Sequence, residues 1–253
     1  MRGTRPLALL AALIASAAAL TSPSAATAAP ACNYPAEVLN LSRWKLQLPL
    51  DDPNQSGTQV LEITQPTLDN YERSPWFVDQ PYCNGVRFRN AVNGVTTPNT
   101  SYARSELREM RGSSGASWSS TSGTHTMVID QAITHRPNTK PQVVAGQIHN
   151  GNDMATFRLD GSSLYVTNEN DTHYKLVDGN YTLGKRFQAK FVVSNGSIKA
   201  YYNNVLQATI PKTFTGGNFK AGVYTQANCT NSSPCDSSNY GETIVYNVTV
   251  THS

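Results

Sequence analysis

The chain has 253 residues, of which 39% are apolar and 15% are charged, and its net charge is +3. This length supports a substantial core, and the apolar content excludes a mostly disordered chain. The low charge, with many Ser, Thr, Asn and Gly residues, argues against a helix bundle and gives no overall signature of nucleic-acid binding.

The N-terminus has the pattern of an export signal. Arg2 and Arg5 precede an apolar run over residues 7–20, and small residues follow, with a cleavage site expected at 26–28. The run is too short to span a membrane, and no second run of spanning length occurs. We therefore expect residues 1–28 to be a signal peptide and the mature protein to be secreted. Without the two arginines the net charge is +1, from 18 Lys and Arg against 17 Asp and Glu.

Export permits disulfide bonds, and the four cysteines are even in number. Cys229 and Cys235 bracket a short polar loop, so pairing them needs only a local turn. Cys32 and Cys83 would then pair and tie the mature N-terminus to the body. Neither pair is a close doublet with a histidine beside it, and the five histidines show no paired metal spacing. We expect no metal and no cofactor.

Strand and turn patterns fill the rest of the chain. The best helical candidates are two short segments, 35–39 and 67–70. Strand patterns occur over 155–159, 164–167, 187–193, 198–202, 205–210 and 243–251. Turn pairs separate several of them, namely Asp160-Gly161, Asn195-Gly196 and Asn203-Asn204. In the last strand, Ile244, Tyr246, Val248 and Val250 are expected on one face. Many short strands separated by such turns indicate an all-β sandwich, formed by one domain over residues 29–253.

Three segments have polar faces of an unusual kind, since every second side chain of a strand shares a face. The segment 102–110 presents Arg104, Glu106 and Arg108, with Glu109 on the other face. The segment 146–150 presents Gln147 and His149, and the segment 219–226 presents Lys220, Gly222, Tyr224 and Gln226. Taken singly, each segment also has a purely structural explanation. The first would be a surface ladder of ion pairs, the second a hydrogen-bonded structural histidine, and the third a solvent-exposed strand face. Together they favour one groove for an extended anionic chain, with Gly222 leaving room for a ligand.

The same segments carry a family resemblance. Arg104-Ser105-Glu106-Leu107-Arg108, Gln147-Ile148-His149 and residues 219–226 resemble, in this order, the signature strands of polysaccharide lyase family 7, the alginate lyases. Residues 44–49 are similar to the family's N-terminal segment. Phe219 and Thr225 depart from the Tyr and Asn of many members. The resemblance implies a β-jelly roll of two curved antiparallel sheets with a concave groove, and β-elimination on alginate without a metal.

The resemblance also implies roles for these residues. Removing the weakly acidic C5 proton of a uronate requires its carboxylate to be neutralised. The implied catalytic set is Arg104 and Gln147 as neutralising donors, His149 as an assistant or base, and Tyr224 as donor to the leaving O4 or as base. The implied substrate-binding set is Glu106, which orients the arginines, with Arg108, Lys220 and Gln226.

Block preference is the finest expectation. Ile148 faces away from the groove, and in this family an Ile there tends to accompany activity on guluronate-containing stretches, a Val activity on mannuronate. Guluronate can offer its C5 proton to His149 while Tyr224 protonates O4 from the other face, whereas mannuronate would need Tyr224 for both steps. We expect a monomer that cuts internally and prefers guluronate-containing blocks.

Three alternatives remain open at this stage. The chain could be a lyase of another polyuronate, such as glucuronan. It could be a non-catalytic carbohydrate-binding sandwich that stacks sugars on Trp118, Tyr201 and Tyr202. A glycoside hydrolase would need two acidic residues, and the polar faces supply only Glu106, which neighbouring arginines would keep ionised.

Overall fold

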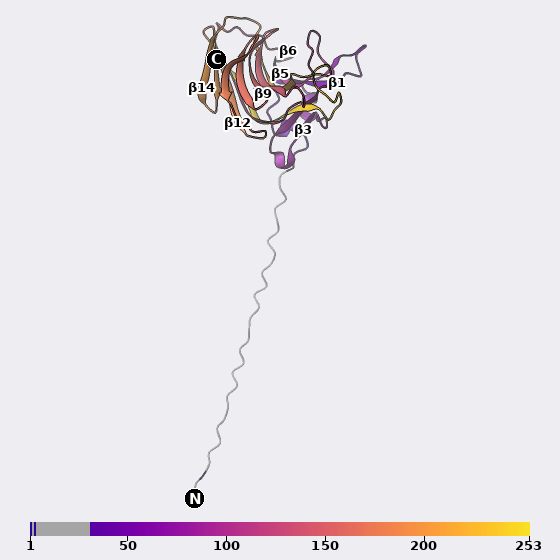
Figure 1. Cartoon of the computed structure of the whole chain (residues 1–253), viewed down its shortest axis with the longest axis vertical. Helices are drawn as coiled ribbons and strands as arrows, with labels where there is room; N and C mark the ends of the chain where they lie inside the picture. Colours follow the sequence, from indigo (N-terminus) through magenta and orange to yellow (C-terminus); the bar gives the residue numbers. More distant parts are fainter. Residues whose placement is uncertain (2, 4–30) are drawn as a thin grey trace.

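The computed structural model describes residues 1, 3 and 31–253. Two antiparallel sheets pack face to face around one hydrophobic core, to which both contribute (Figure 1). The all-β sandwich expected from the strand patterns is therefore confirmed. The signal peptide expected over residues 1–28 lies outside the described residues, apart from residues 1 and 3.

The first sheet, here called the groove sheet, has nine strands in the order β11-β10-β9-β8-β15-β5-β1-β2, with β6 paired to β5. Its strands are β1 (Trp44–Asp51), β2 (Val60–Ile63), β5 (Arg104–Arg111), β6 (Ser114–Gly115), β8 (Gln142–His149), β9 (Asp153–Asp160), β10 (Ser163–Asn168), β11 (Asp171–Asp178) and β15 (Asn218–Thr225). Strand β15 comes late in the chain but pairs between β8 and β5. The three segments with polar faces thus lie side by side in this sheet.

The second sheet, here called the back sheet, has seven strands in the order β14-β13-β12-β7-β16-β4-β3. Its strands are β3 (Phe77–Asp79), β4 (Val86–Ala91), β7 (Thr124–His135), β12 (Phe187–Ser194), β13 (Ser197–Tyr202), β14 (Val205–Pro211) and β16 (Tyr240–His252). The helical candidates form short 3₁₀ turns, η1 (Pro35–Glu37) and η2 (Thr67–Asn70), and a third is η3 (Pro81–Cys83). Within the described part of the chain, no helix has the length and apolarity needed to cross a membrane.

The predicted turn pairs close two hairpins of the back sheet. Asn195 and Gly196 join β12 to β13 with φ of 49° and 67°, and Asn203 and Asn204 join β13 to β14 with φ of 48° and 64°. Two successive residues with positive φ make the turn whose twist matches that of paired strands, and Asn and Gly adopt this conformation most readily. Both turn predictions are confirmed.

The C-terminal strand β16 departs from simple alternation. Val245 pairs with Gln131 and Asn247 with Asp130, so β16 has one extra residue, Tyr246, opposite β7. This bulge exchanges the two faces of the strand, and Val245 and Val248 are both buried. The expectation that Ile244, Tyr246, Val248 and Val250 share one face is therefore wrong.

Both expected disulfides are present. Cys32 bonds to Cys83 with 5.5 Å between the Cα atoms, and Cys229 bonds to Cys235 with 4.8 Å between them. The first joins the start of the described chain to η3, so the N-terminal segment is tied to the sandwich. The second closes the short polar loop that follows β15.

Candidate active site

The strand register brings the predicted side chains into rows across the groove sheet. Tyr224 of β15 pairs with Arg104 of β5. Lys220 pairs with Arg108 on one side and with Gln147 of β8 on the other. Between these rows, β15 has one residue more than β8, so the ladder is irregular at the centre of the sheet.

Gly222 lies in this irregular stretch and has a different role from the one expected. Its φ is +131°, a conformation that residues with a side chain rarely adopt. An added Cβ would lie 2.6 Å from the carbonyl oxygen of Ser105 and 2.9 Å from Cδ1 of Phe88. These contacts are with the neighbouring strand and the core. The glycine therefore permits close packing of β15, and the expectation that it makes room for a ligand is wrong.

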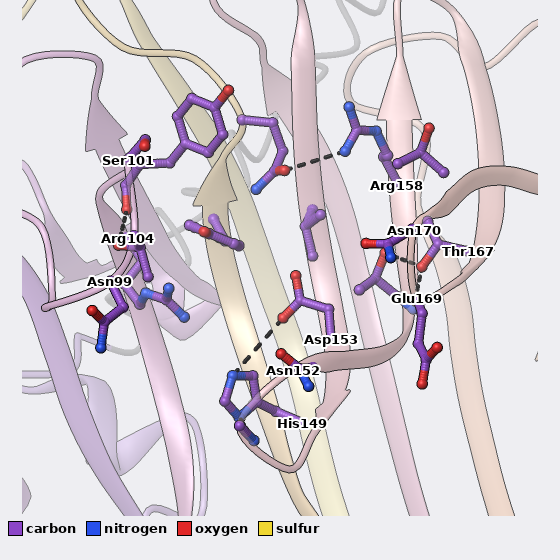
Figure 2. A pocket seen from close by; sticks show the side chains of 18 residues that line it. Asn99, Ser101, Arg104, His149, Asn152, Asp153, Arg158, Thr167, Glu169 and Asn170 are labelled. Atoms are coloured by element: carbon purple, nitrogen blue, oxygen red, sulfur yellow. Dashed lines mark hydrogen bonds and ion pairs between the residues drawn. The ribbon is translucent and has the colours of Figure 1, made fainter. Parts of the chain in front are cut away.

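A groove of about 570 Å³ lies over this part of the sheet. Four of the predicted site residues line it: Arg104, His149, Tyr224 and Gln226. The lining also includes the loop segments 99–102 and 151–152, and residues of β9 and of the turn after β10 (Figure 2). Of the other predicted residues, Glu106 and Gln147 are fully buried, Lys220 is 4% exposed, and Arg108 is partly buried. No group of three or more His, Cys, Asp or Glu side chains among the described residues is arranged to hold a metal ion.

Glu106 links two of the predicted catalytic residues. Its carboxylate accepts a hydrogen bond from Arg104 Nη1 at 3.2 Å and another from Gln147 Nε2 at 2.7 Å. A fully buried carboxylate that accepts from a guanidinium and an amide holds both donors in fixed orientations. Glu106 is thus placed to orient Arg104 and is poorly placed to act as the acid of a hydrolase.

The Tyr224 ring lies under the guanidinium of Arg104, whose central carbon is 4.0 Å from the ring centre. Burial raises the pKa of the Tyr224 phenol, and the positive charge of Arg104 opposes that rise. The resting side chain is therefore a neutral phenol that can donate its proton. Tyr102 packs edge-on against Tyr224, with 6.4 Å between ring centres.

His149 is held in one tautomer by its own loop. The backbone N–H of Gly151 donates to His149 Nδ1 at 3.0 Å, so the neutral ring carries its proton on Nε2. Burial lowers the His149 pKa to about 3, and the charges of Lys220, Arg104 and Arg108 add to this effect. The imidazole is therefore neutral in the free protein at ordinary pH.

Lys220 is charged at neutral pH but loses its proton at a lower pH than an ordinary lysine. Burial lowers its pKa to about 8, although the nearby Glu106 carboxylate favours the charged form. Lys220 and Arg108 lie beside the groove lining rather than in it. Their positive charge thus reaches the groove mainly through space, in a region of low dielectric.

The structure adds Asp153, for which strand alternation gave no signal. His149 pairs with Asp153 and Ile148 with Ala155, so β9 has one extra residue there. The bulge turns the Asp153 carboxylate towards His149, with Oδ1 4.0 Å from Nε2 (Figure 2). Burial raises the Asp153 pKa, and the Glu106 carboxylate adds to the rise.

Arg158 is a second addition, and here the sequence did contain a signal. Residues 155–159 alternate apolar and polar side chains, which assigns Thr156 and Arg158 to the face opposite the core. Both line the groove, and Arg158 Nη1 donates to Gln226 Oε1 at 3.2 Å. The strand itself was recognised, but its polar face was not assigned to the site.

The aromatic residues of the carbohydrate-binding alternative lie elsewhere. Trp118 is buried and stacks on His125 of the back sheet, with 4.4 Å between ring centres. Tyr201 and Tyr202 belong to β13 of the back sheet, where Tyr202 donates to Asp178 at 3.0 Å. The platforms considered for a non-catalytic binding domain are therefore absent from the groove lining.

Comparison with known proteins identifies the family. Residues 39–252 match the family described as alginate lyase. The crystal structure of an alginate lyase from Corynebacterium sp. is 55% identical, covers 88% of this chain and 99% of that chain, and superposes with a TM-score of 0.84. The alginate lyase AlgAT5 from Polysaccharide Lyase family 7 is 46% identical, with coverage of 87% and 99% and a TM-score of 0.81.

A curated relative gives a shorter match. A Klebsiella pneumoniae protein named alginate lyase is 31% identical over 168 residues. The match spans 56% of this chain and about half, 53%, of the relative. The resemblance drawn from the three strand motifs is confirmed by the family match and the solved structures, and with it the jelly-roll fold.

Proposed function

The chain belongs to the alginate lyase family, and we propose that it is a secreted enzyme that cleaves the 1,4-glycosidic bond of alginate by β-elimination. The observation that carries this proposal is the convergence of Arg104, a neutral His149 and a neutral Tyr224 on one groove. β-Elimination needs these three functions: a cationic donor for the carboxylate, a proton acceptor and a proton donor.

Arg104 is proposed to neutralise the carboxylate of the sugar that loses its C5 proton. A guanidinium has five N–H donors, and Glu106 takes only one of them, from Nη1. Gln147 is proposed as the second donor, because its Nε2 gives one N–H to Glu106 and has another. Contact of that N–H with the substrate requires a side-chain movement, since Gln147 is fully buried in the free protein. Both donors stabilise the charge that develops in an enolate-like transition state.

His149 is proposed as the base when the substrate is guluronate. To accept a proton at Nε2, the ring must move its own proton to Nδ1, where Gly151 N–H now donates. That bond lies at an exposed loop, so exchanging it for water costs about 1 kcal/mol. Substrate carboxylates would offset the charges that lower the His149 pKa, and Asp153 would stabilise the imidazolium that forms.

Tyr224 is proposed to protonate the leaving O4, which breaks the glycosidic bond and leaves an unsaturated uronate. Arg104 over its ring stabilises the phenolate that remains. Around these residues, Glu106 orients Arg104, Arg108 and Lys220 attract the polymer, and Gln226 contacts a neighbouring sugar. These assignments are consistent with the register of β5, β15 and β8.

Guluronate-containing blocks are the proposed preference. The buried Ile148 lies directly before His149 and sets the depth of β8 through core packing, where even one methylene is felt. Internal cleavage is proposed because the groove is open and crosses several strands, so that a polymer can lie along it. Secretion is supported by the leader pattern of residues 1–28 and by the two disulfides.

The test uses the mature protein after treatment with a chelator. Alginate, polyguluronate, polymannuronate and glucuronan are supplied separately, and ultraviolet absorbance of the unsaturated product is followed while product sizes are measured. We expect a rise on alginate, an early fall in polymer length, and faster initial rates on polyguluronate or mixed blocks. New reducing ends without absorbance would mean hydrolysis, and intact polymer would mean binding alone. A faster rate on glucuronan would move the substrate assignment to that polymer.

A further inference from the structure

Arg158 is a buried arginine that is held by neutral side chains. Its residue is 9% exposed, and it makes no ion pair with any described residue. Nη1 donates to Gln226 Oε1 at 3.2 Å and Nη2 donates to Gln142 Oε1 at 2.6 Å, and both acceptors are neutral amides. Asp160 and Asp153 favour the charged form of Arg158 only through space, and burial still lowers the Arg158 pKa, so the loss of hydration of the charge is only partly compensated.

The Arg158 guanidinium has N–H donors that make no hydrogen bond to a described residue. Two of the five guanidinium N–H groups go to the glutamines, and the buried Nε has no hydrogen-bond partner in the described structure. The amide nitrogen of Gln226 is likewise buried, with the Tyr224 phenol as its polar neighbour. The nearest acidic partner of this cluster, Asp160, accepts from Gln142 Nε2 at 2.8 Å and from His173 instead. Each Nη keeps a second N–H that a carboxylate in the groove would satisfy, and that carboxylate would add a negative charge in direct contact. Reaching the buried Nε would require a side-chain movement.

The register places Arg158 in line with the proposed catalytic residues. Arg104 pairs with Tyr224, Tyr224 with Val144, and Val144 with Arg158, and all four line the groove. Adjacent strands are about 4.8 Å apart, so the two arginines stand roughly 14 Å apart along this row. That separation exceeds one pyranose ring. In a polymer that lies along the row, the two arginines would therefore contact the carboxylates of different sugars.

We propose that Arg158, held by Gln142 and Gln226, is a second carboxylate-binding position of the groove, which takes a uronate next to or beyond the sugar that is cut. The inference rests on the proposed function, because it assumes that a polyuronate occupies the groove. The glutamines set the plane of the guanidinium, so that its free N–H groups face a carboxylate as a fork. The position acts on binding and on the length of substrate that is held, whereas the proton transfers stay with His149 and Tyr224.

Kinetics on substrates of different length test the proposal. Arg158→Met keeps most of the side-chain volume and removes the donors, and Arg158→Lys keeps the charge without the fork. We expect Arg158→Met to raise KM for long alginate about tenfold, as for loss of a charge-assisted hydrogen bond. The rise should be smaller on the shortest oligomer that is cut, kcat should change less than KM, and Arg158→Lys should recover part of the loss. Arg186→Met is the matched control, because Arg186 pairs with Asp130 of the back sheet, outside the groove lining.

A binding measurement separates this inference from the proposed function. Calorimetry compares alginate binding by Tyr224→Phe with binding by the double variant Tyr224→Phe, Arg158→Met. Weaker binding by the double variant supports the proposal. Equal binding, an unchanged KM, or a fall in kcat and melting temperature at constant KM overturns it, since the last would mean that Arg158 only stabilises the strands. Wild-type protein that acts on no polyuronate overturns the proposed function itself.

Discussion

The guanidinium carbon of Arg104 lies 4.0 Å from the centre of the Tyr224 ring, on the adjacent strand of the groove sheet. The contact couples the two functions proposed for these residues, because the cation that binds the substrate carboxylate also stabilises the phenolate that forms when O4 is protonated. The two steps of the elimination are thus linked through a single stacked pair.

Removing the Tyr224 hydroxyl should separate chemistry from binding. Tyr224→Phe keeps the ring under Arg104, so the affinity for alginate should stay within about threefold, while kcat falls by about 10²-fold or more. Absorbance kinetics and calorimetry on the same preparation measure both quantities. A variant with near-normal turnover would move the proton donation to another group.

Lys220 should set the alkaline limit of activity. Its pKa of about 8 in the free protein means that the groove loses one positive charge above that pH, so kcat/KM should fall there. Lys220→Arg stays charged, and its profile should remain flat over the same range.

The lowered pKa of Lys220 affects folding stability in the opposite direction from activity. Between pH 8 and the ordinary lysine pKa of 10.5, the unfolded chain binds more protons at this site, so the contribution of Lys220 to stability rises with pH. Loss of activity in this window without a fall in melting temperature is therefore expected. A profile that is the same for Lys220→Arg would contradict the assignment.

Asp153 should matter most where His149 is the base. Asp153→Asn removes the carboxylate 4.0 Å from Nε2, and we expect kcat on polyguluronate to fall about tenfold, the effect of one unit in the imidazole pKa. On polymannuronate, where Tyr224 serves both steps, the fall should be smaller. Equal losses on the two polymers would mean that Asp153 does not act through His149.

Salt should weaken substrate capture. Arg104, Arg108 and Lys220 attract a polyanion through a partly open groove, and charges at that range are screened within about 10 Å at 0.1 M ionic strength. KM should therefore rise with ionic strength while kcat changes little. If KM stays constant from low to high salt, these cations are already neutralised within the protein.

Glu109 should contribute to the stability of the fold and have no part in catalysis. It faces away from the groove, as strand alternation predicted, and accepts from Trp118 Nε1 at 3.1 Å and from the backbone N–H of Phe219 at 2.9 Å. A third contact joins it to His252 at 2.6 Å. Glu109→Gln should cost about 1–3 kcal/mol and lower the melting temperature by about 3–10 °C, with kcat unchanged at 25 °C. A large loss of kcat in folded protein would contradict this reading.

Local patterns were enough for much of the fold and for the centre of the candidate site. The Asn-Gly and Asn-Asn turns formed as predicted because their backbone conformation depends on the two residues themselves. The alternation over residues 104–109 placed Glu106 beneath the groove and Glu109 in the core because the side-chain period of a strand is local. The disulfides followed from spacing and number.

Other features depended on how distant strands pair. The bulges at Met154 and Tyr246 each add one residue opposite a partner strand, and a one-residue change exchanges the two faces. The same applies to Gly222, whose missing side chain faces the core, and to Arg158, which joined the site only through the register of β9 with β8 and β15. The alternation of side chains and the turns could be predicted because they depend on residues that are neighbours in the chain. Which polar faces meet, and where a strand gains a residue, became visible only in the folded protein, because register is set by contacts between segments that lie far apart in the chain.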